Sequence, residues 1–213
     1  MERFFAPVPT DLVPAMWIRR ILSLTFVGLF VFEVLNYFQF LSFHVDYTWL
    51  GRFVSTLVMF GALRLIDEGF RRKLGTRLQG RVWLLMTVLL WFDFLGDVFG
   101  FYSRWTWYDQ VVHFLSGILL VSCLWIVVRT FATRLQWVIP NSVLALLALG
   151  INTMFAVLYE AEEYLEDVLF GTNRLGDGFD TANDLLLNWV AGVLVILSLF
   201  IWKRFCRRQA QSL

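Results

Sequence analysis

The sequence has 213 residues, of which 59% are hydrophobic, 18% aromatic and only 16% charged. Soluble globular proteins carry about 25% charged residues, so this composition excludes an ordinary soluble domain and indicates a protein in contact with membrane lipids. The net charge of +1 offers no basic surface for a nucleic acid, and we expect no nucleic-acid partner.

Residues 1–14 contain three prolines and few basic residues, which predicts a short cytosolic lead-in rather than a cleaved signal peptide. Six apolar runs follow, and each is close to the twenty or so residues with which a helix crosses a hydrocarbon core of about 30 Å. The predicted transmembrane helices are residues 18–40, 48–66, 82–101, 109–128, 137–160 and 181–202. We therefore expect an all-α fold, with residues 1–213 forming a single polytopic membrane domain.

The basic residues predict the orientation of these helices. Fifteen of the 18 lie before the first run, between the second and third, between the fourth and fifth, or after the sixth. The other three are Arg52, Arg104 and Arg174. By the positive-inside rule, this alternation predicts that both termini are cytosolic.

The acidic residues show the opposite distribution, because 13 of the 17, together with both histidines, lie on the outer half. At the helical rise, Glu33, Asp93 and His113 lie roughly 18–24 Å from the nearest cytosolic basic residues, and so occupy one layer in the outer leaflet. An unpaired carboxylate at that depth is costly. We therefore expect Glu33 and Asp93 to face the bundle interior and to be paired, protonated or metal-bound.

Polar residues recur at helical spacing, so that each of four predicted helices turns them to one face. The four stripes are Asp93 and Asp97; Asp109 and His113; Asn152, Ala156, Glu160 and Glu163; and Asp177, Asp180, Asp184 and Asn188. Carboxylates that meet in a low dielectric repel one another unless cations neutralise them or protons bind. The stripes therefore favour a divalent-cation site at the outer end of the bundle.

Carboxylate oxygens with one imidazole suit Mg, Mn, Ca, Zn or Fe, and we expect no other cofactor. The candidate metal ligands are Asp109, His113, Glu160, Glu163, Asp177, Asp180 and Asp184. The candidate catalytic residues are Asp93, Asp97 and His113. His113 would act as a base or ligand, and the two aspartates would support the ligands or relay protons.

Plainer interpretations stand beside these. The three aspartates at the start of the sixth helix can cap it, and His113 can be a satisfied bundle histidine. The remaining outer acids are expected to be solvated at the membrane interface: Asp46, Glu162, Glu166 and Asp167. No P-loop is present, so ATP-driven transport by this chain is not expected.

Four segments resemble the signature of the YjdF-like family of bacterial inner-membrane proteins: WFDFLGDVF (91–99), YDQVVHFLSG (108–117), YEAEEY (159–164) and GDGFDTANDL (176–185). Tyr164 stands where the family has Trp. The resemblance covers residues 90–192 and implies a multi-pass protein of the bacterial inner membrane. It marks the same acids and His113, but that family has no defined biochemical activity.

Three classes of function remain open. The first is a metal-dependent membrane enzyme, a hydrolase or transferase acting on a phosphate-containing lipid or isoprenoid head group. The second is a cation or proton-coupled transporter that uses its intramembrane acids, and the third is a structural or regulatory membrane subunit. In the outer layer only Arg104 and Arg174 are expected to be available to a phosphate. The sequence leaves the substrate, the metal and the oligomeric state open.

Overall fold

The computed structural model describes residues 14–211, so the lead-in expected before the first helix lies outside the described residues. Within them, seven helices make up all the regular secondary structure. They are α1 (Pro14–Tyr37), α2 (Trp49–Leu74), α3 (Gly80–Val98), α4 (Phe101–Arg104), α5 (Tyr108–Arg134), α6 (Asn141–Phe170) and α7 (Gly178–Gln211). The expected all-helical bundle is confirmed.

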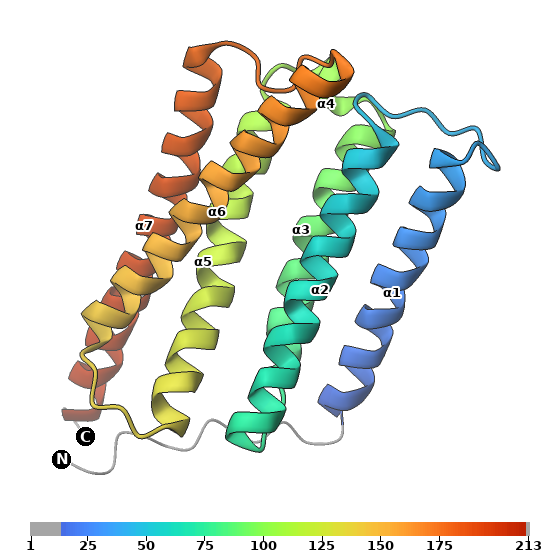
Figure 1. Ribbon diagram of the computed structural model, residues 1–213. Coiled ribbons are helices and arrows are strands. Elements are labelled where there is room, and N and C mark those ends of the chain that lie inside the picture. Colours follow the sequence, from blue (N-terminus) through green and yellow to red (C-terminus); the bar gives the residue numbers. More distant parts are fainter. Residues whose placement is uncertain (1–13, 212–213) are drawn as a thin grey trace.

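Four helices are long and apolar enough to cross a membrane, within Trp49–Leu74, Tyr108–Arg134, Asn141–Phe170 and Gly178–Cys206. The helices α1 and α3 run beside them (Figure 1) and overlap the predicted spans 18–40 and 82–101. Large apolar side chains lie exposed on the outside of the bundle, including Leu24, Leu65, Leu146 and Ile201. Such a surface suits hydrocarbon and not water, so the protein is a membrane protein with several transmembrane helices.

Several helix ends differ from those predicted. The second helix was expected to end at residue 66, but α2 continues to Leu74 and ends at Gly75, whose φ of 62° is left-handed. Likewise α6 continues ten residues past the predicted end at 160, to Phe170, and Gly171 ends it with a φ of 69°. Hydropathy marks where the apolar side chains end, whereas the helical hydrogen bonds continue until a left-handed residue interrupts them. The loop between α6 and α7 is therefore only residues 171–177.

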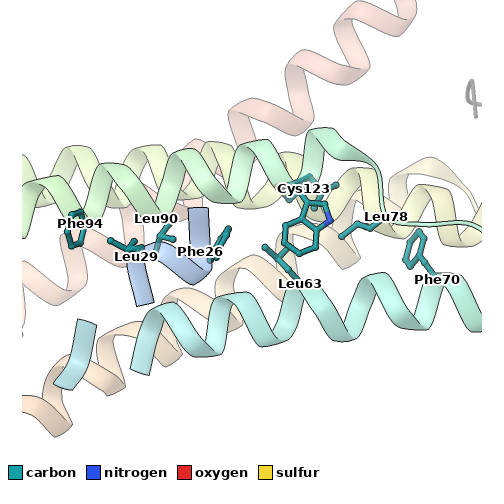
Figure 2. Packing of buried hydrophobic residues seen from close by; sticks show 10 residues of the cluster. Phe26, Leu29, Leu63, Phe70, Leu78, Leu90, Phe94 and Cys123 are labelled. Carbon is teal, nitrogen blue, oxygen red and sulfur yellow. The ribbon is translucent and has the colours of Figure 1, made fainter. Parts of the chain in front are cut away.

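The bundle consists of two halves of three long helices. In one half α1 packs against α2 and α3, in the other α5 packs against α6 and α7, and the contact of α3 with α5 joins the halves. An apolar cluster runs along α3 from Phe94 to Val82, where α1, α2 and α5 meet it (Figure 2). It includes Phe26, Leu63, Trp83 and Cys123. This cluster packs α1, α2 and α3 together beneath the acidic end of the bundle.

The α1–α2 loop, α4 and the α6–α7 loop gather at one end of the bundle, at the top of Figure 1. The described N-terminus of α1 and the C-terminus of α7 lie at the opposite, basic end. The acidic stripes are therefore brought to the same end of the bundle.

Candidate functional site

Three side chains from two helices converge at the acidic end. Asp109 and His113 lie on successive turns of α5, and Asp184 lies in α7; one ligand atom from each lies within 4.8 Å of the others. His113 Nε2 is 3.6 Å from Asp109 Oδ1 and 3.7 Å from Glu160 Oε1 of α6. Asp109, His113 and Asp184, called the metal triad below, thus have Glu160 as a neighbouring fourth group.

The close approach of α5 and α7 places Asp184 beside His113. A Cβ on Gly117 would lie 2.3 Å from the backbone oxygen of Asn188, so only glycine allows the two helices to cross this closely. Gly117 is one turn from His113, and Asn188 is one turn from Asp184. The crossing therefore sets the two polar stripes face to face.

Several ligand atoms of this site have no hydrogen-bond partner among the described residues. These are His113 Nε2, both carboxylate oxygens of Glu160 and Asp184 Oδ1. The three residues are only 3%, 6% and 2% exposed, respectively. Buried polar atoms are nearly always hydrogen-bonded, so these atoms are free to bind a ligand such as a cation. The Asp109 side chain is 25% exposed, so the site is accessible from its side.

A short polar ladder continues from the triad toward the middle of the bundle. Asn188 Nδ2 donates to Ser116 Oγ at 2.8 Å, and Asn152 Nδ2 donates to Asn188 Oδ1 at 2.6 Å. The next buried residues are apolar, with Val121 and Ala148 fully buried. In the part of the chain that the structure describes, the buried polar chain from the triad ends at Asn152.

Glu163 is not brought to the metal triad, because it binds Arg174. The Arg174 guanidinium lies 3.2 Å from Glu163, 2.9 Å from Glu166 and 3.3 Å from Glu162. It also donates to the Tyr159 hydroxyl at 3.0 Å. One buried arginine thus binds three glutamates of α6, and we call these four residues the Arg174 cluster.

The two outer loops close over the Arg174 cluster. The guanidinium stacks over the Tyr47 ring at 4.6 Å, and Thr48 Oγ1 donates to Glu166 at 2.5 Å. Burial opposes the charge on Arg174, but Tyr159 and the glutamates outweigh it, so the pKa of Arg174 lies above its ordinary value. Arg174 is therefore a permanent cation that ties the α6–α7 loop to α6 and to the α1–α2 loop.

The expectation of solvated interface acids is wrong for Glu166, which is 4% exposed. Asp167 is also engaged, since it accepts hydrogen bonds from Thr172 and from the backbone of Arg174 and Leu175. Loop residues remote from the apolar pattern supply these partners, which is why the sequence did not indicate them.

Asp93 and Asp97 lie in a second buried cluster, centred on Arg52 of α2. Arg52 Nη1 is 2.6 Å from Asp93, and its Nε is 3.6 Å from Asp97 and 4.0 Å from Glu33 of α1. The Tyr102 hydroxyl of α4 donates to Asp93 at 2.7 Å. Arg52 is therefore a third arginine in the outer layer, but the acids around it leave it unavailable to a phosphate. The sequence contained one signal for this role, because Arg52 is a single basic residue that follows the first outer loop.

The remaining predicted ligands lie at the start of α7. Asp177 Oδ1 accepts the backbone N–H groups of Phe179 and Asp180, which is the geometry of a helix cap. The Asp180 carboxylate packs closely against Gly176, because a Cβ added to Gly176 would lie 2.2 Å from Asp180 Oδ2. Of the seven candidate ligands, the structure brings together Asp109, His113, Glu160 and Asp184, and it does not bring Glu163, Asp177 or Asp180 into that group.

No curated protein and no solved structure matches this chain. One family, described as a predicted membrane protein (DUF2238), matches residues 18–205, which include the metal triad, three of the four long apolar helices and most of α7. The chain therefore belongs to the DUF2238 family of predicted membrane proteins.

Proposed function

We propose that this protein binds a divalent cation at Asp109, His113 and Asp184, with Glu160 as a fourth ligand. The bound metal would serve the hydrolysis or transfer of a phosphate-containing lipid or isoprenoid head group. The observation that carries the proposal is the group of unpartnered, buried ligand atoms on His113, Asp184 and Glu160.

The charge of the site supports a cation. Asp109, Asp184 and Glu160 are three carboxylates around one imidazole, and the buried arginines Arg52 and Arg174 are engaged by other acids. Like charges in a low dielectric repel strongly, and a divalent ion would relieve most of that repulsion. Three oxygen donors and one nitrogen suit a hard or borderline metal such as Mg, Mn, Zn or Fe.

The charge pattern also bears on the substrate. Arg52 and Arg174 are each bound by three carboxylates, so neither is free to bind a phosphate. When bound, a metal would supply the positive charge that holds phosphate oxygens and the acidity that activates a water. Both oxygens of Glu160 are unpartnered, so one could bind the metal while the other accepts the proton of that water.

The location that fits this proposal is the bacterial inner membrane, with both termini cytosolic and the triad toward the outer leaflet. The resemblance of residues 90–192 to the YjdF-like family supports the membrane, and the distribution of arginines supports the orientation. The substrate would then reach the site from the outer leaflet, through the exposed side of Asp109.

Cation transport is the second candidate, because the Asn152–Asn188–Ser116 ladder extends the polar site inward. An ion that crossed the bundle would next meet the apolar layer of Val121 and Ala148. Metal-dependent chemistry at one face needs no such passage, and we therefore place it first.

Metal analysis of the purified protein tests the site itself. We expect one divalent ion per chain in the wild type after incubation with each metal and desalting, and a loss of that ion in Asp184→Asn and in His113→Ala. Asp177→Asn is the matched control, because it alters an exposed cap of the same helix and should keep the metal. The proposal fails if the wild type holds no stoichiometric metal, or if the triad variants hold as much as the wild type.

Proteoliposomes distinguish the two candidate functions. Release of phosphate from a phosphate-containing lipid, lost in Asp184→Asn and on chelation, supports the enzyme. Movement of a divalent ion across the vesicle membrane without such release supports transport.

A further inference from the structure

The cluster around Arg52 has more acidic than basic groups, although it is buried in the α1–α3 half. Glu33 of α1 is 0% exposed, Arg52 of α2 is 5% exposed and Asp97 of α3 is 1% exposed. With Asp93, three carboxylates face a single guanidinium. Fully ionised, the cluster would carry a net charge of −2 at the depth of the membrane, which is strongly unfavourable.

The hydrogen bonds show which carboxylate is compensated best. Asp93 receives Arg52 Nη1 on one oxygen and the Tyr102 hydroxyl on the other, at 2.6 and 2.7 Å. Two strong donors stabilise the ionised form of a carboxylate. Asp93 is therefore the anion that pairs with Arg52.

Glu33 and Asp97 share what remains of the guanidinium. Both approach Arg52 Nε, at 4.0 and 3.6 Å, which is outside hydrogen-bond distance. Asp97 is still held on its other oxygen by the backbone N–H of Tyr47 at 3.1 Å. The Glu33 carboxyl receives only the Thr56 hydroxyl, at 2.9 Å, and its Oε2 has no partner among the described residues.

We propose that Glu33 binds a proton at neutral pH, and that Glu33 and Asp97 form a proton-binding pair separate from the metal triad. Two buried carboxylates that share one guanidinium retain a proton, because a single positive charge that is already paired with Asp93 cannot compensate both of them when ionised. The charged and titratable groups that face Glu33 are Arg52 of α2 and Asp93 and Asp97 of α3. The pair occupies the other half of the bundle from the triad, so this proposal does not depend on the metal.

Infrared spectroscopy of the purified protein tests the proposal directly, because a protonated carboxyl group has a C=O stretching band that a carboxylate lacks. We expect the neutral-pH spectrum of Glu33→Gln to lose one such band relative to the wild type. Its melting temperature should stay close to that of the wild type, because Gln is neutral and keeps an oxygen for Thr56. An unchanged band, together with a lowered melting temperature, would mean that Glu33 is an anion paired with Arg52.

A second variant keeps Glu33 in place and guards against misfolding of the first. In Asp97→Asn the neighbouring negative charge is removed, so the Glu33 proton should leave at a lower pH than in the wild type. The control is Glu68→Gln, since Glu68 lies at the basic end and pairs with Arg71 and Arg72, and its spectrum should keep the band. A band whose pH dependence is the same in Asp97→Asn and the wild type would refute the shared site.

Discussion

Replacing Arg174 with Gln is the sharpest test of how the acidic end is held together. The change removes the only cation that the structure places on Glu162, Glu163 and Glu166, within the described residues. Gln keeps the aliphatic stem of Arg174 but lacks the guanidinium, so the effect reports on the charge, its hydrogen bonds and its stacking over Tyr47.

The magnitude follows from burial. Glu163 and Glu166 are 6% and 5% exposed at their side chains, and breaking a buried ion pair from one side costs about 3–5 kcal/mol. The Glu162 side chain is 28% exposed, and its pair adds at most about 1 kcal/mol. We expect Arg174→Gln to lower the free energy of unfolding by about 3–5 kcal/mol at neutral pH.

Denaturant or thermal unfolding in detergent measures this difference. Arg104→Gln is the control, because Arg104 lies at the same end but is exposed, and its effect should stay within about 0.5 kcal/mol. Adding Glu163→Gln to Arg174→Gln should recover part of the loss, since one unpaired buried charge is removed. The penalty should also shrink at acid pH, where protonated glutamates need no cation. Equal stabilities of the two arginine variants would refute this account of the Arg174 cluster.

Two further substitutions test the packing that positions the site. Gly117→Ala should destabilise the protein by about 1–3 kcal/mol and weaken metal binding, because the added Cβ would meet the Asn188 backbone. The control is Gly150→Ala, which should be neutral or slightly stabilising because a Cβ there has nothing within 4 Å. Thermal unfolding measures the stability of both variants, and metal titration measures their metal binding. Asp67→Asn should cost about 1–3 kcal/mol in the same unfolding assay. The buried Asp67 carboxylate closes the α2–α3 turn by accepting the backbone N–H of Leu78 at 2.8 Å on one oxygen and Arg77 Nη1 at 2.7 Å on the other, and the amide of Asn can accept only one of these donors. If Gly117→Ala left the stability unaltered, α5 and α7 could separate without cost. If Asp67→Asn left it unaltered, other contacts would hold the α2–α3 turn.

The helical character and the polar stripes were predictable because they are local properties. Asp109 and His113 are four residues apart in a helix, so they share a face whatever packs against them. The same holds for Asp93 and Asp97, which both reach Arg52. Helix ends were less predictable, because a left-handed residue such as Gly75 or Gly171, and not hydropathy, ends the helix.

The choice of partner for each acid was not predictable in this way. Glu160 and Glu163 lie on one face of α6, yet Glu160 points to His113 while Glu163 binds Arg174 from the α6–α7 loop. Arg52 could not be distinguished from an interface arginine, because its role depends on acids from α1 and α3. Such pairs join residues far apart in the chain, and local periodicity contains no information about them.

The amino-acid sequence was sufficient for the membrane environment, the helical class and the end of the bundle at which the acids collect, since each follows from composition, run length and charge order. The packing of the helices decided which of these residues meet at the site. Asp184, rather than Asp180 or Asp177, meets Asp109 and His113 because Gly117 lets α7 cross α5 at Asn188. The rotation of one helix against another decides which turn of a stripe faces its neighbour, and that rotation exists only once the helices have packed.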